Sequence, residues 1–389
     1  MNQQYNSTRD RVQEEKTTNF DIVRYIKQTS HDIWNKKNIG KIYEYCAPNI
    51  VGVINSHCPY HCNEQVVVDS IHHLAAFPDT RIQIDDVVWS GNDQDGYKTS
   101  VRWTIIAHHT GSSKYGLATG RKICITGITN SVVKLDSSNN NLAADEWQNG
   151  QTTEAYIQYD ELSVIRQLDL SPFEIIKTME KYELLAKPIE PEVGNIERRV
   201  DRQVRSIVVQ DEDCFHVENF VRKSIEDIWN HRLIGNIENY YSMDFRYHGP
   251  GDRELEQSHE YQLDILTRLS IFPNTKIHID DFFCMGSEEE GFRTSMRWTL
   301  LGNHGGFGEY GPPTGKKVRL AGITNYIIRE GKFVEEWTHY SEFGLMQQLR
   351  TSEKEKDSHI YETEVHSLQD ELTTVNGMTP HLLYKEVRG

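Results

Sequence analysis

An internal repeat divides the chain into two similar halves. The motif Ile33-Trp34-Asn35 recurs as Ile228-Trp229-Asn230, a separation of 195 residues, and Gly127-Ile128-Thr129-Asn130 recurs as Gly322-Ile323-Thr324-Asn325 at the same separation. Similarity at one fixed offset over such a length indicates two copies of one folding unit. Each copy must bury its own hydrophobic core, and a chain of 389 residues is long enough for two domains.

The offset changes near the end of the first copy. Gln167-Leu168 pairs with Gln348-Leu349 at a separation of 181, so the first copy carries 14 extra residues. These fall between Lys134 and Glu154, where Asp, Ser, Asn and Gly residues favour turns. We expect a lengthened hairpin there.

Helices are expected first in each copy and strands after them. Apolar residues at helical spacing predict a helix over residues 20–38 and 215–233. A second helix is predicted over 64–76 and 258–271, each ended by Phe-Pro, because the residue before proline disfavours the helical conformation. Strands, with equivalents in the second copy, are predicted over 81–89, 97–108, 122–135 and 155–168.

This order of elements predicts an α+β fold. We expect two tandem cone-shaped domains, each a strongly curved, mostly antiparallel sheet wrapped around its N-terminal helices and leaving a cavity for a small molecule. The expected division of the chain is a polar arm (1–18), the first domain (19–186), a Pro-, Glu- and Arg-rich linker (187–213), the second domain (214–350) and a charged tail (351–389).

Charge and composition narrow the partners. A formal net charge of −16 disfavours binding to nucleic acid. The polar N-terminus and the lack of a long apolar stretch predict a cytoplasmic protein that does not enter a membrane, and six cysteines are too few for a disulfide scaffold. His57, Cys58, His61 and Cys62 resemble zinc ligands by type, but they lie within six residues and the second copy lacks them, so no metal is expected.

The motifs of the second copy resemble the SnoaL-like polyketide cyclase family, within the nuclear transport factor 2-like superfold. They include Tyr247-His248-Gly249-Pro250-Gly251, Gly302-Asn303-His304-Gly305-Gly306 and Glu335-Glu336-Trp337. The resemblance implies an ester-cyclase type of chemistry without metal or organic cofactor, in which an acidic residue near the Trp of the last strand acts as acid and base. A carboxylate whose pKa is raised in an apolar pocket suits that role.

Four side chains are candidates for the acid/base role: His109, Asp160, His304 and His339. Strand alternation places His109 with Trp103, and correspondingly His304 with Trp298, while His339 follows Trp337 by two residues. Asp160 is the only carboxylate at the position implied by the family, because the second copy has Ser341 there. The alternatives are histidines that bond loop carbonyls at a strand end and, at position 339, drift at an exposed residue.

Aromatic and histidine side chains are candidates for substrate binding: Trp103, Tyr115, Tyr156, Tyr159, His248, Trp298, Tyr310, Trp337 and Tyr340. Phenols donate to a developing oxyanion, although a repeated tyrosine is more often a packing residue with one hydrogen bond.

Two hypotheses for function follow. The first is a cofactor-free cyclase, isomerase or lyase that acts on a small, largely apolar carbonyl compound, with unequal pockets because Asp160 faces Ser341 in the alignment and Gln158 faces His339. The second is a non-catalytic small-molecule-binding or scaffold protein. In both, the fused copies imitate a homodimer as an intramolecular pseudo-dimer, and further homo-oligomerisation is left open.

Overall fold

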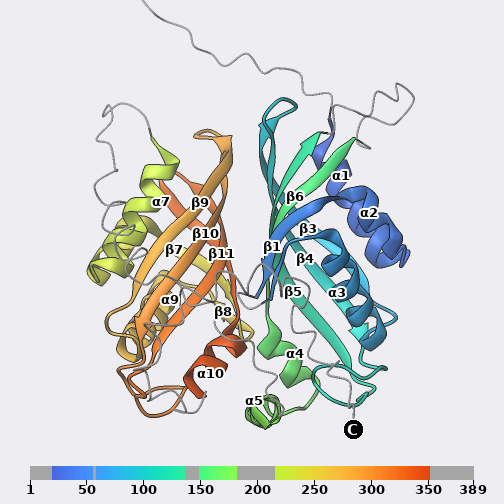
Figure 1. Ribbon diagram of the computed structural model, residues 1–389. Coiled ribbons are helices and arrows are strands. Elements are labelled where there is room, and N and C mark those ends of the chain that lie inside the picture. Colours follow the sequence, from blue (N-terminus) through green and yellow to red (C-terminus); the bar gives the residue numbers. More distant parts are fainter. Residues whose placement is uncertain (1–19, 56–57, 136–148, 182–214, 351–389) are drawn as a thin grey trace, which may run out of the picture.

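Two α+β domains stand side by side in the computed structural model (Figure 1), which describes residues 20–55, 58–135, 149–181 and 215–350. The predicted fold, two tandem domains each with a curved sheet and helices, is confirmed. The expected arm, linker and tail, at 1–18, 187–213 and 351–389, lie outside the described residues. Within the described residues, no helix is long and apolar enough to cross a bilayer.

Domain 1 is built on a six-stranded sheet with the order β2-β1-β6-β5-β4-β3. Its elements are α1 (Ile22–Ser30), α2 (Ile42–Tyr45), β1 (Cys46–Ile54), β2 (Cys58–Tyr60), α3 (Asn63–Ala76), β3 (Arg81–Asn92), β4 (Gly96–His108), β5 (Lys122–Leu135), β6 (Gly150–Tyr159), α4 (Glu161–Gln167) and α5 (Pro172–Lys181). Neighbouring strands of the sheet pair antiparallel except β1 and β6, which are parallel.

Domain 2 repeats this arrangement with the order β8-β7-β12-β11-β10-β9. Its elements are α7 (Val217–Ile225), α8 (Ile237–Tyr240), β7 (Tyr241–Gly249), β8 (Arg253–Leu255), α9 (Ser258–Ile271), β9 (Lys276–Ser287), β10 (Gly291–Asn303), β11 (Lys317–Arg329), β12 (Lys332–Tyr340) and α10 (Glu342–Arg350). The helices α7 and α9 lie on the outer side of the sheet, away from domain 1 (Figure 1).

The predicted helices and strands are found, with one error. The stretch 155–168 was expected as a strand, yet the strand β6 ends at Tyr159 and the helix α4 follows. Asp160 caps this helix, because its Oδ1 accepts a hydrogen bond from the backbone N–H of Ser163 at 3.0 Å. The predicted hairpin joins β5 to β6, which pair at Leu135 and Gly150, while its connecting residues lie outside the described part.

The two sheets meet through contacts that repeat with the pseudo-symmetry of the chain. Ser100 Oγ donates to Asn325 at 2.9 Å, and the equivalent residues Asn130 and Ser295 are joined at 3.0 Å. The counterparts of two bonded residues are thus bonded to each other as well, as in a two-fold dimer interface.

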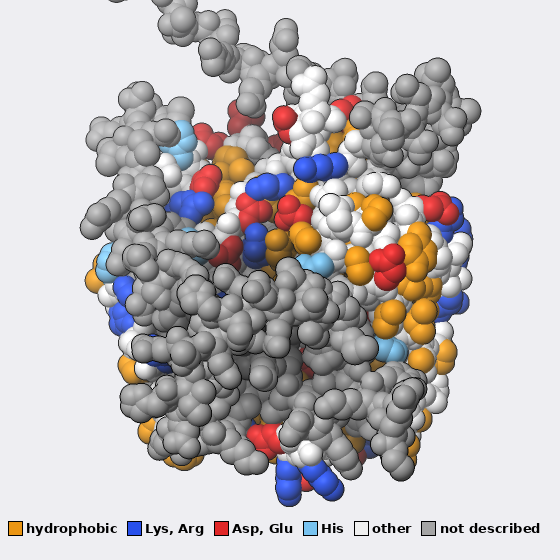
Figure 2. Space-filling view, in the orientation of Figure 1, with side chains coloured by type: hydrophobic (Ala, Val, Ile, Leu, Met, Phe, Trp, Pro, Cys, Tyr) orange, Lys and Arg blue, Asp and Glu red, His pale blue; other side chains and the backbone are white. Residues whose placement is uncertain are grey.

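Guanidinium groups stacked on aromatic rings across the interface also come in pseudo-symmetric pairs. Arg102 lies over the Trp337 ring at 3.6 Å, and its counterpart Arg297 lies over Tyr156 at 3.9 Å. Figure 2 shows acidic and basic side chains side by side in the upper middle of the molecule. One ion pair between the domains joins Lys98 to Asp281 at 2.5 Å. The chain therefore folds as an intramolecular pseudo-dimer.

Candidate functional site

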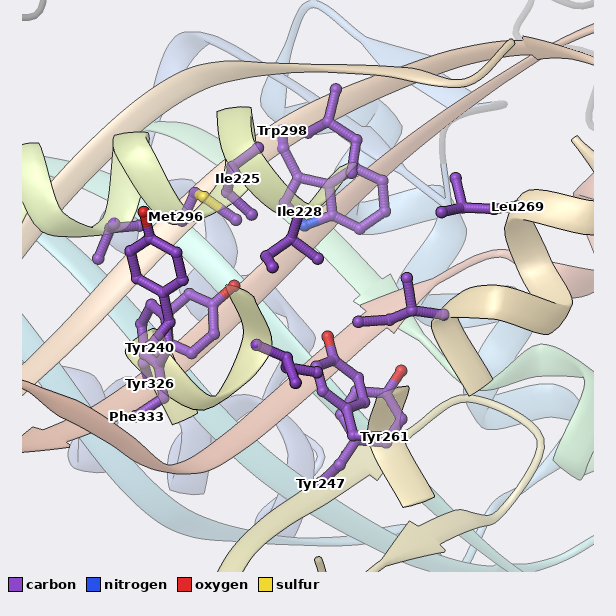
Figure 3. Close-up of a cluster of buried hydrophobic side chains, with 14 of the residues drawn as sticks. Ile225, Ile228, Tyr240, Tyr247, Tyr261, Leu269, Met296, Trp298, Tyr326 and Phe333 are labelled. Carbon is purple, nitrogen blue, oxygen red and sulfur yellow. The ribbon is translucent and has the colours of Figure 1, made fainter. Parts of the chain in front are cut away.

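A cavity of about 70 Å³ lies in domain 2, between α9 and the concave face of the sheet. Its walls are mostly apolar and aromatic, and they include Trp298, Met296 and Leu320. Figure 3 shows several of these side chains converging from α7, α9 and the strands. Trp298 is held flat on the sheet because its indole N–H donates to Thr324 Oγ1 at 2.9 Å and Gly322 offers no Cβ beneath the ring.

The register of the strands decides which side chains of β12 reach this cavity. Trp298 pairs with Gly322, and Gly322 pairs with Tyr340, so Trp298 and Tyr340 point to the same face of the sheet. Side chains alternate along a strand, and Thr338 and Glu336 therefore share that face with Tyr340. All of them line the cavity.

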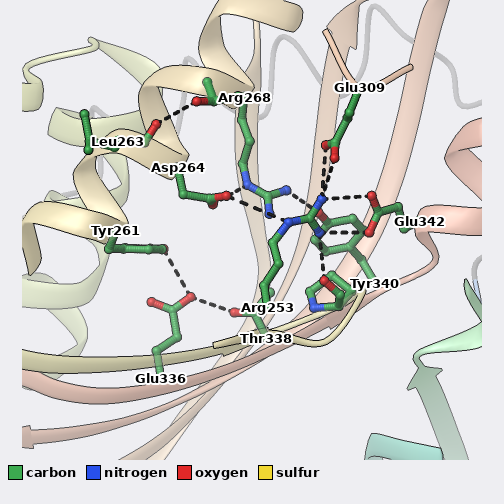
Figure 4. Close-up of polar contacts among 12 residues, drawn as sticks. Arg253, Tyr261, Leu263, Asp264, Arg268, Glu309, Glu336, Thr338, Tyr340 and Glu342 are labelled. Carbon is green, nitrogen blue, oxygen red and sulfur yellow. Dashed lines mark hydrogen bonds and ion pairs between the residues drawn. The ribbon is translucent and has the colours of Figure 1, made fainter. Parts of the chain in front are cut away.

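Glu336 is the only carboxyl group that β12 contributes to the cavity wall. Its side chain is 3% exposed. The Tyr261 hydroxyl donates to Oε1 at 3.2 Å, and the Thr338 hydroxyl donates to the same atom at 2.7 Å (Figure 4). The other oxygen, Oε2, is buried and has no hydrogen-bond partner among the described residues.

Burial changes the acid strength of this group. It raises the pKa of Glu336 to about 7, although the hydrogen bonds from Thr338 and Tyr261 act in the opposite direction. A carboxyl group that titrates near neutrality both accepts and returns a proton at physiological pH.

A tyrosine lies beside this acid. Tyr247 lines the cavity and packs against Tyr261 with ring centroids 4.8 Å apart. Burial raises the pKa of the Tyr247 hydroxyl, so this group is protonated and is a hydrogen-bond donor. A hydroxyl donor next to a carboxyl base is a pairing suited to a ligand carbonyl.

Charged side chains from α9 and a loop also line the cavity (Figure 4). Arg268 donates from Nε to Asp264 at 2.6 Å and from Nη1 to the Tyr340 hydroxyl. Its Nη2 is buried without a hydrogen-bond partner in the described part of the chain. Acidic and basic side chains are paired with one another in this cluster.

Domain 1 lacks this set of polar groups. The positions of Glu336, Tyr261 and Tyr247 are occupied by Ala155, Val66 and Gly52 in the alignment of the two copies. The Tyr60 ring packs there instead, because its hydroxyl donates to the Ala155 carbonyl at 2.5 Å and lies within 2.3 Å of where a Cβ on Gly52 would be.

The expected substrate residues divide into two groups. Trp298, Tyr310 and Tyr340 line the cavity of domain 2. Trp337 and His248 do not line it, because Trp337 points to the opposite side of β12. There the Trp337 ring lies between the Arg102 guanidinium and the His248 ring, and the centroids of the two rings are 5.1 Å apart. Tyr156 faces Arg297 in the same way. These three side chains lie in contacts at the domain interface and not on the wall of the domain 2 cavity.

The counterparts in domain 1 are engaged in structural contacts. Trp103 is buried and donates to Thr129 at 2.9 Å. The Tyr115 hydroxyl donates to Glu161 at 3.1 Å, and Lys114 donates to the Tyr159 hydroxyl at 3.3 Å while it forms an ion pair with Glu161.

The histidines expected on the strand ends bind loops. His109 is fully buried, with Nδ1 accepting from the Thr119 N–H at 3.3 Å and Nε2 lying 2.9 Å from Ser113 Oγ. His304 repeats the first contact with Thr314, while its Nε2 has no partner in the described residues. His304 stacks behind the cavity wall on Phe272 at 5.5 Å.

The other two candidates lie between the domains and not on the wall of the domain 2 cavity. His339 is buried on the Trp337 side of β12, where burial, with the positive charge of Arg102 nearby, lowers its pKa to about 4. Asp160 is 3% exposed and contacts the Gly251 N–H of domain 2. The acid/base expectation did not include Glu336. Alternation along β12 places Glu336 on the same face as Tyr340, and this signal in the sequence could have pointed to it.

No group of three His, Cys, Asp or Glu side chains in the described ranges is arranged to hold a metal ion. Of the four residues compared with zinc ligands, His57 lies outside those ranges. Cys62 is a free thiol, and the backbone N–H of His61 donates to Gln65 at 2.7 Å.

Solved structures similar to this chain come from several bacteria. A protein from Acidithiobacillus ferrooxidans matches with 23% identity over 34% of this chain and 93% of that chain, with a TM-score of 0.30. A SnoaL-like polyketide cyclase from Agrobacterium tumefaciens matches with 11% identity over 35% and 99%, TM-score 0.29. TsrD from Streptomyces laurentii matches with 17% identity over 34% and 94%, TM-score 0.30.

Among curated proteins, no match was found. The family model of the SnoaL-like polyketide cyclases matches the chain twice, at residues 25–136 and 219–349. The two matches together span more than half of the chain and fall one on each domain. The chain belongs to the SnoaL-like polyketide cyclase family.

Proposed function

We propose that domain 2 is a cofactor-free acid/base enzyme of the cyclase, isomerase or lyase type that acts on a small, largely apolar carbonyl compound. The observation that carries this proposal is Glu336, a buried carboxyl group on the cavity wall with one oxygen unpartnered among the described residues and a pKa near 7. The family match supports the same class of reaction.

The first chemical step is removal of a proton from the carbon next to the carbonyl group. The Glu336 carboxylate takes this proton, so a C–H bond breaks and an O–H bond forms on Glu336. The electron pair moves onto the carbonyl oxygen, which becomes an enolate and accepts a hydrogen bond from the Tyr247 hydroxyl. The protonated Glu336 then returns its proton to another carbon or to a new alkoxide.

The size and lining of the cavity favour a compact substrate. Its volume of about 70 Å³ is roughly half that of an engineered apolar cavity that binds benzene. Trp298, Met296 and Leu320 supply an apolar wall that excludes water and keeps Glu336 largely protonated below neutral pH.

Domain 1 is proposed to be a non-catalytic partner. Ala155 stands where the acid would be, and Tyr60 packs against it. Nearby, Lys114 forms an ion pair with Glu161, which is buried, so the interior of this domain is organised by structural contacts. The idea of a purely binding or scaffolding role therefore applies to domain 1.

The test measures exchange of the α-protons of butan-2-one in D₂O by proton NMR. The wild-type protein is expected to accelerate exchange over buffer, and Glu336→Gln to reduce that acceleration about 100-fold or more, since general base catalysis contributes roughly 10²- to 10⁴-fold. The matched control is Glu335→Gln, because Glu335 points away from the cavity and binds Arg246 and His248. Exchange that survives in Glu336→Gln would overturn the proposal.

A further inference from the structure

A tight turn of domain 2, close to the cavity, is hydrogen-bonded to domain 1. The turn joins β7 to β8 and consists of Pro250, Gly251 and Asp252. Gly251 and Asp252 have φ values of 74° and 60°, two consecutive left-handed residues, of which the second is strained for a residue with a Cβ. A residue with a Cβ in this sparsely populated region is held there by its surroundings.

The first residues of α4 provide hydrogen bonds to this turn. The Gly251 N–H donates to Asp160 Oδ2 at 2.7 Å. Ser163 Oγ lies 2.9 and 3.0 Å from the two carboxylate oxygens of Asp252. Asp160 therefore divides its two oxygens: one caps its own helix, and the other holds the neighbouring domain.

Arg253 connects the turn to the cavity. Its guanidinium donates to the Pro250 carbonyl at 2.7 Å, to Glu342 at 2.8 and 3.0 Å, and to Glu309 at 2.9 and 3.1 Å. Glu309 lines the cavity. Figure 4 shows Arg253 at the centre of this cluster.

The carboxylate of Glu342 depends on Arg253. Glu342 is 3% exposed, and although burial acts in the opposite direction, the hydrogen bonds and charge of Arg253 hold its pKa below the usual value. Glu342 also accepts from the hydroxyl of the cavity residue Tyr310 at 2.9 Å. A shift of the turn would thus disturb two cavity-lining side chains, Glu309 and Tyr310.

Among the described residues, α4 of domain 1 holds a turn of domain 2, but α10 of domain 2 does not hold a turn of domain 1 in the same way. At the position of Asp160, domain 2 has Ser341, whose hydroxyl caps α10 by accepting from the Gly344 N–H at 3.0 Å. At the position of Glu309, domain 1 has Lys114, which binds Glu161 directly. Domain 1 therefore organises its own buried glutamate without an arginine from a turn.

We propose that Asp160 is a positioning residue, through which domain 1 holds the turn 250–252 and Arg253 at the rim of the domain 2 cavity. The second domain depends on the first for a correctly shaped binding site, which gives the non-catalytic copy a role. The effect on turnover rests on the proposed function, whereas the effect on the turn itself does not.

The experiment compares Asp160→Ser with the wild type by hydrogen–deuterium exchange mass spectrometry of full-length protein. Serine keeps a helix cap, as Ser341 does, but is too short to bridge to Gly251. Amide exchange in the peptide covering 250–255 is expected to rise about tenfold, with the β-strands of both domains unchanged. Ser163→Ala removes the contact to Asp252 and should act in the same direction. Asp21→Ser, at the cap of α1, is the matched control.

A second readout separates this role from general stability. In Asp160→Ser, the KM for butan-2-one exchange is expected to rise several-fold while the apparent pKa of the pH profile stays near that of the wild type. Unchanged exchange in 250–255, or a rise spread evenly over the whole chain, would overturn the inference. Loss of turnover in Glu336→Gln together with an unaltered turn in Asp160→Ser would leave the proposed function standing and remove this one.

Discussion

Glu336 and Trp337 are neighbours in the chain, but they point to opposite sides of β12. Glu336 lines the cavity, while Trp337 lies against Arg102 of the other domain at a distance of 3.6 Å. The strand β12 thus contributes to two surfaces: the cavity on its concave side and the domain interface on its convex side. The acid that we propose as the catalytic base is thus the immediate neighbour of this tryptophan.

The first prediction concerns the pH dependence of α-proton exchange. Glu336 must be deprotonated to act as the base, and its pKa is raised to about 7. The rate is therefore expected to rise with pH through about 7 and then level off. Initial rates of butan-2-one exchange between pH 5 and 9 measure this profile. A midpoint near the usual pKa of a glutamate would contradict the assignment.

The second prediction concerns the hydroxyl group that stabilises the Glu336 carboxylate. Thr338 donates to Oε1 at 2.7 Å and thereby lowers the pKa of Glu336. Thr338→Val removes this donor but keeps the shape of the side chain. The midpoint of the pH profile should move upward, to above 7. A midpoint that moves downward would show that Thr338 does not stabilise the charged form.

The third prediction is that removing the acid stabilises the fold at high pH. The pKa of Glu336 is raised from 4.5 to about 7 on folding, so the folded state keeps a proton that the unfolded state loses. The free energy of unfolding must then fall as pH rises from about 4.5 to 7. Glu336→Gln should avoid this loss, a gain of about 3 kcal/mol at pH 8 and little at pH 4.5. Urea denaturation at both values measures the difference.

The two sides of β12, one facing the cavity and one facing domain 1, show how much of the structure the sequence could predict. The repeat, the helices and most strands follow from local patterns, since each is a property of neighbouring residues. The side of β12 that faces the cavity follows from its pairing with β11, which in turn pairs with β10, a strand further back in the sequence. Trp298, two strands away from β12, shares its face with Tyr340, so the cavity lies on the side of β12 opposite Trp337.

Asp160 is a second case in which a local sequence pattern could not predict the contacts of a side chain. Its position, four residues after the aromatic residue of the last strand, matches the acid implied by the family. The structure gives its oxygens to a helix cap and to the turn of the other domain. Contacts between the two copies depend on their docking, and no spacing within one copy predicts them.

The fourth prediction concerns the stacked pairs of the interface. Arg102 lies on Trp337 and its counterpart Arg297 lies on Tyr156. A double-mutant cycle with Arg102→Met and Trp337→Leu is expected to give a coupling energy of about 1 to 2 kcal/mol, because the pair is largely desolvated. The equivalent cycle with Arg297→Met and Tyr156→Leu should give a smaller value, since tyrosine is the weaker cation–π partner. Equal or zero couplings would contradict the geometry.

The fifth prediction separates His339 from catalysis. This histidine is buried in the interface, and its pKa is lowered from 6.5 to about 4. The folded state therefore binds fewer protons than the unfolded state between these values, so the free energy of unfolding falls as pH decreases from about 6.5 to 4. His339→Gln, which installs the residue found at Gln158, should remove that loss, a gain of about 3 kcal/mol at pH 4 that is absent at pH 8. Urea denaturation at the two pH values measures it. Butan-2-one exchange at pH 8 should stay at the wild-type rate, and a large decrease there would return His339 to the catalytic machinery.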